Sequence, residues 1–412
     1  MRRIGNLFDS IVDMDNLRLA FLKASRGKRS RMDQREYQAN LNEELSNLRK
    51  GLLDGTYHVG CYSHFKIYDP KVREICAAAF KERVLHHALM NICEPWFDKW
   101  LIERTFACRK GLGQVKAVAK AHISARRNKW YLKCDYKKYF DSIPHEGLKG
   151  MLRSKFKDER VLYWFDRIID SHETFPQRGL PIGTLTSQHF ANLYLDKIDR
   201  LFPGLDYVRF MDDFVVWGNS KDDMLKFRDK ILECSEKVLG LTLKEPVVNR
   251  TNHGMDFLGM RIFPKTVRAN RRSIGRYKRK MRHYEYLFNA GEISECKLQS
   301  RVTALTAFLK QGDTLAWRRN FFGGRREVSG SNRVIRGGSW NNDASNCTSS
   351  NRNNNTPSNN NNNNGFRLAC SAAPQEQTAV PVGFLFPVFR DKYPGETELV
   401  GVSKTTIRRF SI

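Results

Sequence analysis

Two apolar runs in the middle of this chain carry acidic residues at positions where a buried strand normally has none. The run "WYLKCDYKKYF" (130–140) holds one, Asp135, and the run "YVRFMDDFVVW" (207–217) holds an adjacent pair, Asp212 and Asp213. β-Branched and aromatic residues on both sides of the pair predict a hairpin with the aspartates at its turn. A surface turn with two aspartates is the simpler alternative, and the separate strand with Asp135 weighs against it.

The rest of the chain limits the fold around these strands. Residues 6–55 have helical periodicity, and residues 60–80 have the pattern of short strands. From 130 to 218 strands alternate with helices, which predicts a fold of the α/β (α+β) class. A length of 412 residues implies two or three domains, because a single core rarely grows beyond about 250–300 residues.

The charge of the chain points to a polyanionic partner. Lys and Arg number 71 against 44 Asp and Glu, so the net charge is +27. Basic residues among aromatic ones are typical of nucleic-acid binding, with adhesion to ribosomes or to an anionic membrane surface as the alternative. The nine cysteines form no CxxC pair and no regular framework, so we expect reduced thiols and a cytoplasmic protein. The sequence has no apolar run of about 18 residues and no signal-peptide pattern at its start, so we expect no membrane-spanning segment.

Carboxylates from separate elements are what phosphoryl transfer with two metal ions requires. Two Mg²⁺ ions roughly 3.5–4 Å apart activate the attacking oxygen and stabilise the leaving oxygen. Carboxylates gathered that closely repel one another unless cations compensate them. Asp135 on one strand and the pair Asp212 and Asp213 in a later hairpin fit this requirement as candidate catalytic and metal-binding residues.

Four segments resemble reverse transcriptases, in the order that this family has them. "FMDD" (210–213) resembles the (Y/F)xDD motif, and "DYKKYF" (135–140) resembles the first palm motif. "KVREICAAAFKERVLHHAL" (71–89) is similar to the fingers segment, and "DFLGMRI" (256–262) is similar to the primer grip. The resemblance implies an RNA-directed DNA polymerase with the right-hand fold of fingers, palm and helical thumb.

The resemblance also implies domain boundaries. The N-terminal helices and fingers would occupy residues 1–128 and the palm residues 129–264. A basic helical thumb would occupy residues 265–321, and an Asn-rich tail that we expect to be largely irregular would occupy residues 322–412.

Individual roles follow from the family's motifs. Asp135 and Asp212 would bind both metal ions, with Asp213 in support. Phe140 falls at the aromatic position that excludes a ribose 2′-hydroxyl, although core packing would also explain it. Lys244 would approach the leaving pyrophosphate, although an exposed lysine without a role would fit as well. The residues expected to bind the incoming nucleotide are Lys71, Arg73, Arg83, Phe140, Ile182, Gly183, Gln188 and Lys244.

A basic segment lies where the family has its thumb, "RANRRSIGRYKRKMRHYEYLF" (268–288). A helix would bring several of its cations near one face. A run of charge is usually a solvated face, but one so dense in a single sign favours contact with a phosphate backbone. The residues expected to bind nucleic acid are Arg272, Arg276, Arg279 and Lys280.

One motif departs from most reverse transcriptases. Where they have QGxxxSP, this chain has "IGTLTSQ" (182–188). An aliphatic residue before Gly and a Gln after Ser resemble the reverse transcriptases of diversity-generating retroelements, which are found in bacteria and phages. This resemblance implies copying of a structured template RNA into cDNA with errors at template adenines. It also implies dNTPs and a small basic helical accessory protein, present as an oligomer, as partners.

Two alternatives stay open. A retron or group II intron type enzyme would share the palm motifs, but the intron type typically has QGxxxSP. A catalytically inactive RNA-binding assembly protein with a polymerase fold would not need all three aspartates.

Asparagine fills 13 of the 24 positions from 341 to 364. The flanking "RVIRGGSWNN" (333–342) and "GFRLA" (365–369) resemble the end of a C-type-lectin-like, sulfatase-modifying-factor-type domain. A low-complexity tail, a linker and a fragment of a folded module are ordinary explanations. A fourth is a translated template repeat, because the Asn codons AAT and AAC each carry two adenines. We expect this tail to be poorly ordered.

Overall fold

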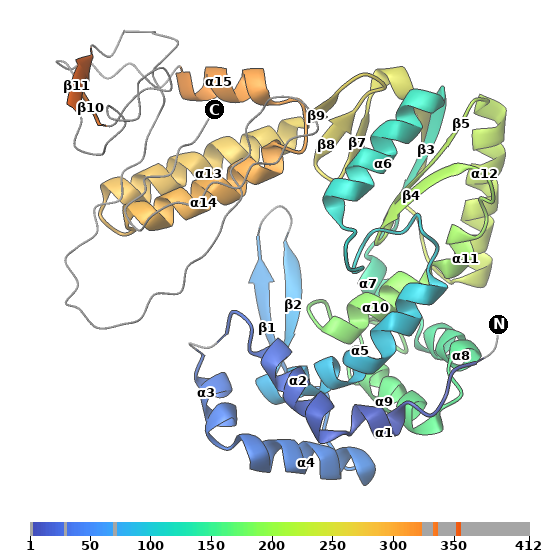
Figure 1. The fold of residues 1–412 in the computed structure, drawn as a ribbon. Helices are drawn as coiled ribbons and strands as arrows, with labels where there is room; N and C mark the ends of the chain where they lie inside the picture. The colour runs from blue at the N-terminus through green and yellow to red at the C-terminus, as the bar shows by residue number, and fades with distance from the viewer. Residues whose placement is uncertain (1–2, 29–30, 69–71, 324–332, 337–351, 356–412) are drawn as a thin grey trace, which may run out of the picture. The chain divides into compact units, whose positions relative to one another are not determined.

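The structure, a computed structural model, describes residues 3–28, 31–68, 72–323, 333–336 and 352–355 (Figure 1). Lys71 and most of the Asn-rich block therefore lie outside the described residues. The chain forms two compact units, Met1–Val267 and Arg268–Ile412, which we describe separately.

The first unit begins with helices that pack on a long central helix, α5 (Phe80–Trp100). The predicted helical region contains α1 (Phe8–Ile11), α2 (Met14–Ala24), α3 (Met32–Ala39) and α4 (Leu41–Leu53). The carboxylate of Asp13 accepts hydrogen bonds from the amides of Asp15 and Asn16, so it satisfies two free N–H groups at the start of α2. Strands β1 (Tyr62–Ile67) and β2 (Arg73–Ala78) form an antiparallel hairpin between α4 and α5.

A four-stranded antiparallel sheet follows, in the order β4-β5-β3-β6. Its strands are β3 (Trp130–Asp135), β4 (Asp206–Phe210), β5 (Asp213–Gly218) and β6 (Val247–Arg250). Helices α6 (Gln114–Arg127) and α12 (Lys221–Glu233) pack against it (Figure 1). The two central strands are β5 and β3, and β5 is buried from Phe214 to Gly218, which explains its nearly unbroken apolar sequence.

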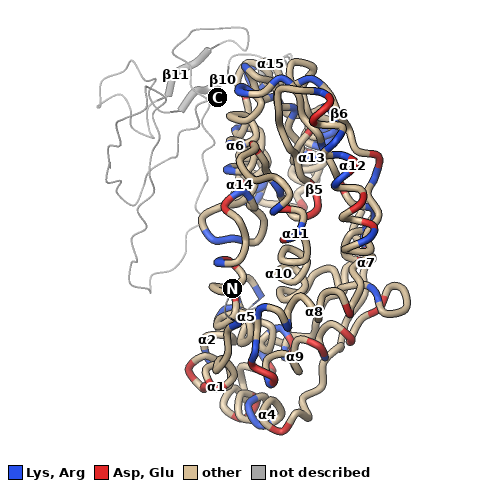
Figure 2. Tube along the Cα trace, turned by 90° about the vertical axis from the view of Figure 1, so that its right-hand side faces the viewer, with Lys and Arg blue, Asp and Glu red and all other residues tan. Residues whose placement is uncertain are grey.

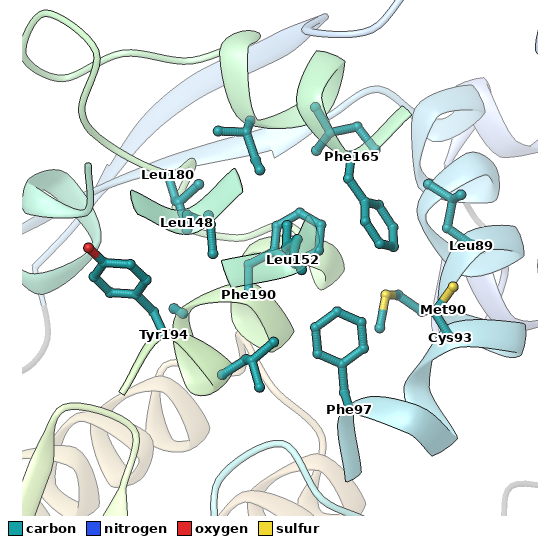
Figure 3. Packing of buried hydrophobic residues seen from close by; sticks show 14 of the residues in the cluster. Leu89, Met90, Cys93, Phe97, Leu148, Leu152, Phe165, Leu180, Phe190 and Tyr194 are labelled. Carbon is teal, nitrogen blue, oxygen red and sulfur yellow. The ribbon is translucent and has the colours of Figure 1, made fainter. Parts of the chain in front are cut away.

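The main hydrophobic core lies where α5 meets the helices that connect β3 to β4 (Figure 3). Phe97 of α5 lies at its centre, with its ring 6.0 Å from that of Phe190 and 6.4 Å from that of Phe165, measured between ring centroids. The connecting helices are α7 (Tyr139–Ser142), α8 (His145–Lys155), α9 (Glu159–Asp170), α10 (Leu185–Tyr194) and α11 (Asp196–Asp199). Packing in this core fixes the position of α10.

A second, three-stranded sheet follows in the order β7-β8-β9, and the first unit ends at the first residue of β9. The segment that resembles a primer grip forms the hairpin of β7 (Met255–Phe257) and β8 (Met260–Ile262). Its two turn residues, Leu258 and Gly259, both have positive φ, as tight two-residue hairpins require. The remaining short elements are η1 (Cys234–Val238), η2 (Thr251–His253) and β9 (Val267–Ala269).

The second unit contains α13 (Arg271–Asn289), α14 (Glu295–Leu309) and α15 (Leu315–Gly323). Tyr277, Met281 and Leu309 form a small core of their own, against which Trp317 and Phe321 pack. Two short strands in the predicted tail, β10 (Arg333–Arg336) and β11 (Arg352–Asn355), pair antiparallel. The rest of that tail lies outside the described residues.

Basic residues outnumber acidic ones over the chain as a whole and are spread along the traced helices and loops (blue and red in Figure 2). Within the described segments, none of the helices combines the length and the apolar character that crossing a bilayer requires.

Candidate active site

The register of the four-stranded sheet brings the predicted aspartates together. Asp135, the last residue of β3, pairs directly with Asp213, the first residue of β5. Phe210 also pairs with Asp213, so β4 and β5 are joined by a two-residue turn of Met211 and Asp212. Met211 has a φ of 58°, in the left-handed region that costs a residue other than glycine some strain. Such strain commonly lies at functional sites.

Asp135 lies against Lys244. The Lys244 ammonium group donates a hydrogen bond to the Asp135 carboxylate, and its backbone amide donates to the Asp135 carbonyl oxygen at 2.8 Å. The two side chains are 43% and 36% exposed, so solvent reaches this pair. The loosely aligned lysine of the sequence is thus a neighbour of the carboxylates.

Asp212 and Asp213 lie in surroundings that disfavour their charged forms. Burial and then the neighbouring Asp135 raise the pKa of Asp212. Burial raises the pKa of Asp213 to about 7, although Lys133 opposes this shift. The Lys133 ammonium nitrogen lies 3.3 Å from Asp213 Oδ1, yet that oxygen accepts no hydrogen bond. Two adjacent carboxyl groups with raised pKa values would be stabilised in their charged forms by a nearby cation.

This donor set suits a hard divalent cation, because carboxylate oxygens are the ligands such ions prefer. The buried, unbonded Asp213 Oδ1 and the adjoining Asp212 fit that use. In the described part of the chain, however, no three acidic, histidine or cysteine side chains converge closely enough to hold an ion as they stand. Lys244 and Lys133 instead pair with Asp135 and Asp213.

The "IGTLTSQ" loop lies against the fingers hairpin. The amide of Cys76 in β2 donates to the Ile182 carbonyl oxygen at 2.9 Å. Gly183 has a φ of +126°, and a Cβ there would lie 3.0 Å from Ile75 Cγ2 and 3.2 Å from the Cys76 carbonyl oxygen. Only glycine lets this loop approach β2 so closely. Gln188, half-buried in α10, accepts a weak hydrogen bond from the Cys108 thiol at 3.5 Å.

Two of the other predicted nucleotide residues, Phe140 and Arg83, lie near this loop. Phe140 is half-buried in α7, and its carbonyl oxygen accepts from the Leu180 amide at 2.9 Å. Arg73 is exposed at the start of β2, and its charge acts to lower the pKa of Asp212. Arg83 donates to the Ala78 carbonyl oxygen at 2.8 Å and, with Gly183, lines a small pocket. Lys71 lies outside the described residues.

The predicted basic residues of α13 lie beside its buried face, which contains Ser273, Tyr277 and Met281. Arg272 and Arg279 are exposed, and Lys280 is half-buried. The guanidinium carbon of Arg276 lies 5.8 Å from the centroid of the Phe308 ring, so this side chain also covers an aromatic residue of the second unit.

Two residues of the site were not predicted. Lys133 stands two positions before Asp135 in β3, and the alternation of a strand places both on one face. The sequence therefore could have predicted that Lys133 lies near the site. Arg209 lies inside the apolar strand β4 and is fully buried, which signals a partner but does not say which one.

Comparison with known proteins agrees with this geometry. Residues 68–262 match the family model "Reverse transcriptase (RNA-dependent DNA polymerase)", and this range contains all three aspartates. This part of the chain is therefore similar to reverse transcriptase domains. The predictions of an RNA-directed DNA polymerase and of an α/β (α+β) polymerase fold are thereby confirmed. Residues 282–372 match a second model, "Sulfatase-modifying factor enzyme 1-like domain".

Individual relatives of the reverse transcriptase domain are distant. Protein YkfC of Escherichia coli is 22% identical, with 56% of this chain and 74% of the relative covered. Group II intron-encoded protein LtrA of Lactococcus lactis is 24% identical over 38% of this chain, and the match covers 28% of LtrA. Among solved structures, apo telomerase from Candida tropicalis is 14% identical with a TM-score of 0.42, covering 71% of this chain and 65% of that one.

Proposed function

We propose that this protein is the reverse transcriptase of a diversity-generating retroelement. It copies a template RNA of that element into cDNA, makes errors opposite template adenines, and supplies the altered sequence to a target gene. The observation that carries the proposal is the succession of two family matches in one chain. The reverse transcriptase match ends at residue 262, and the sulfatase-modifying-factor match, from 282 to 372, includes the Asn-rich block.

The chemistry assigned to the site is nucleotidyl transfer. Asp135 and Asp212 would hold two Mg²⁺ ions with Asp213 in support, and the ions supply charge stabilisation to the attacking and leaving oxygens. Lys244, which already approaches Asp135, carries a charge that suits the leaving pyrophosphate. Arg73 and Lys71 at the fingers hairpin supply further positive charge to the triphosphate.

Ile182 supports the low-fidelity subtype. A Gln at this position hydrogen-bonds around the incoming nucleotide in most of the family, and a branched aliphatic side chain cannot. One such bond contributes about 0.5–1.5 kcal/mol, so its loss relaxes discrimination by up to roughly tenfold. The Ile182 carbonyl oxygen accepts a hydrogen bond from β2, which fixes the backbone that carries this aliphatic side chain.

The Asn-rich block supports the same subtype. A reading frame that runs through its own template repeat would turn adenine-rich codons into consecutive asparagines. The family match around the block is to the sulfatase-modifying-factor type of domain, and the retroelement resemblance implies that many diversified proteins use this type. We therefore propose that residues 341–364 record template content.

The proposed partners are the retroelement RNA, its cDNA and a small basic helical accessory protein. The net charge of +27 supports the nucleic-acid partners, because each phosphate contact releases counterions. The accessory protein rests on the family resemblance alone.

The subtype is tested with the Ile182→Gln variant. Wild-type enzyme and variant each copy one RNA template, and the cDNA is sequenced. Fewer errors opposite adenine in the variant support the proposal, and an unchanged adenine error spectrum contradicts the role of Ile182. The nucleotide sequence around codons 330–370 gives an independent test, since a neighbouring near-copy must differ mainly at adenines.

A group II intron type enzyme is the second candidate, because the relative LtrA is named as a group II intron-encoded protein. Such an enzyme would copy intron RNA and show no excess of errors at adenine.

A further inference from the structure

Arg209 in β4 is completely buried and faces a buried carboxylate. The Arg209 and Asp199 side chains are both 0% exposed. Arg209 Nε donates to Asp199 Oδ1, and Nη2 donates to Asp199 Oδ2, each at 2.6 Å. This is a two-pronged pairing that only a planar guanidinium can make.

The three remaining N–H groups of Arg209 donate to residues outside the ion pair, in two other parts of the chain. Nη1 donates to the Met211 carbonyl oxygen at 2.9 Å and to Asn192 Oδ1 at 2.8 Å. Nη2 donates to the Asn192 carbonyl oxygen at 2.9 Å. All five N–H groups of the guanidinium are therefore used.

These partners belong to the two halves of the site. Met211 is the strained residue of the turn that carries Asp212. Asn192 lies in α10 one helical turn after Gln188, so it belongs to the helix that continues the "IGTLTSQ" loop. The Asn192 amide also donates to the Ala107 carbonyl oxygen at 2.9 Å, which fixes its orientation.

Stability alone does not explain this arrangement. A buried ion pair contributes little compared with apolar residues of similar size, because both charges lose their hydration. A left-handed residue such as Met211 persists where its surroundings hold it in place. The Arg209–Met211 bond acts directly on that residue, because it fixes the direction of the carbonyl group between Met211 and Asp212.

We propose that Arg209 is a positioning residue, which holds the Met211–Asp212 turn in its catalytic geometry and ties this turn to helix α10. The proposal rests on the proposed polymerase function of the aspartates. Arg209 touches neither nucleotide nor metal ion, and it acts through the backbone of the turn.

The decisive variant is Arg209→Lys. Lysine keeps a positive charge opposite Asp199, but its three donors cannot serve the five bonds that Arg209 makes. The matched control is Tyr207→Phe in the same strand. The fully buried Tyr207 hydroxyl donates to Asp199 Oδ1 at 2.7 Å, so the control removes a bond to the same carboxylate and leaves the turn untouched.

Two measurements test the role. The first is amide hydrogen exchange in the full chain without added metal, over residues 205–218 and 185–194. We expect Arg209→Lys to speed exchange at the Met211–Asp213 amides by about tenfold or more, and Tyr207→Phe to leave these amides unchanged. The second is steady-state dNTP incorporation with Mg²⁺, where we expect kcat to fall by at least about tenfold and KM to change by less than about threefold.

The proposal is overturned if Arg209→Lys exchanges like the wild type at the turn, or if Tyr207→Phe has the same effect on exchange and kcat. Where Arg209→Lys does not fold, Asn192→Ala replaces it. That variant keeps the ion pair and removes one bond from Arg209 to α10, together with the bond from Asn192 to the Ala107 carbonyl oxygen. Faster exchange at both the turn and α10 then supports the link that Arg209 makes between them, and unchanged exchange refutes it. A wild-type enzyme without incorporation would refute the polymerase function, while the exchange data would still decide whether Arg209 holds the turn.

Discussion

Replacing Gly183 by alanine tests the link between the "IGTLTSQ" loop and the fingers hairpin. The φ of +126° is one that side chains rarely adopt, and such strain costs about 1–3 kcal/mol. The new Cβ would also lie 3.2 Å from the carbonyl oxygen of Cys76, a residue that pairing of β2 with β1 holds in place. If the loop lifts away, the bond between the Cys76 amide and the Ile182 carbonyl is lost, at about 0.5–1.5 kcal/mol.

These terms predict that Gly183→Ala lowers the free energy of unfolding by about 1.5–4.5 kcal/mol. They also predict a rise in KM for dNTP of roughly tenfold. A tenfold loss of affinity corresponds to about 1.4 kcal/mol of binding free energy. The assays are chemical denaturation and steady-state incorporation. Gly204→Ala is the matched control, because Gly204 has a φ of +76° and no atom within 4 Å of the position that a Cβ would take. A wild-type KM in Gly183→Ala, or an equal rise in Gly204→Ala, would refute this reasoning.

Three further substitutions test other parts of the molecule. Asp212→Asn should reduce Mg²⁺-dependent incorporation by more than about a hundredfold. The melting temperature should stay equal or rise, because the variant removes repulsion from Asp135, and a large loss of stability would contradict this. Phe97→Ala should cost about 3–5 kcal/mol in urea unfolding, and a cost below about 1 kcal/mol would contradict the central place of Phe97 in the core. Arg272→Gln should reduce the slope of log K against log salt for RNA binding by about 0.7–0.9, and an unchanged slope would exclude a phosphate contact.

Much of the fold could be predicted because its signals are local. The apolar and aromatic residues on both sides of Asp135 and of Asp212 indicated β3 and the β4–β5 hairpin directly. The family resemblance placed a helical thumb at the basic run from residue 268, and α13 begins at Arg271. These predictions depend on neighbours in sequence, which composition and spacing reveal.

The contacts around the site could not be predicted in the same way, because they join residues far apart in the chain. Lys244 reaches Asp135 across 109 positions, and Cys76 meets Ile182 only when the hairpin folds onto the loop. Arg209 was visible as a cation inside an apolar strand, but its partners lie on α10 and α11, whose positions depend on packing around Phe97. The roles of Arg83 and of the α13 cations stay predictions.

The central claim is tested most directly by sequencing the cDNA that the purified full chain makes on one defined RNA template with Mg²⁺ and all four dNTPs. Our account predicts cDNA that depends on Mg²⁺ and on Asp212, with misincorporation concentrated opposite template adenines. Absence of cDNA, or errors spread evenly over the four template bases, would contradict it.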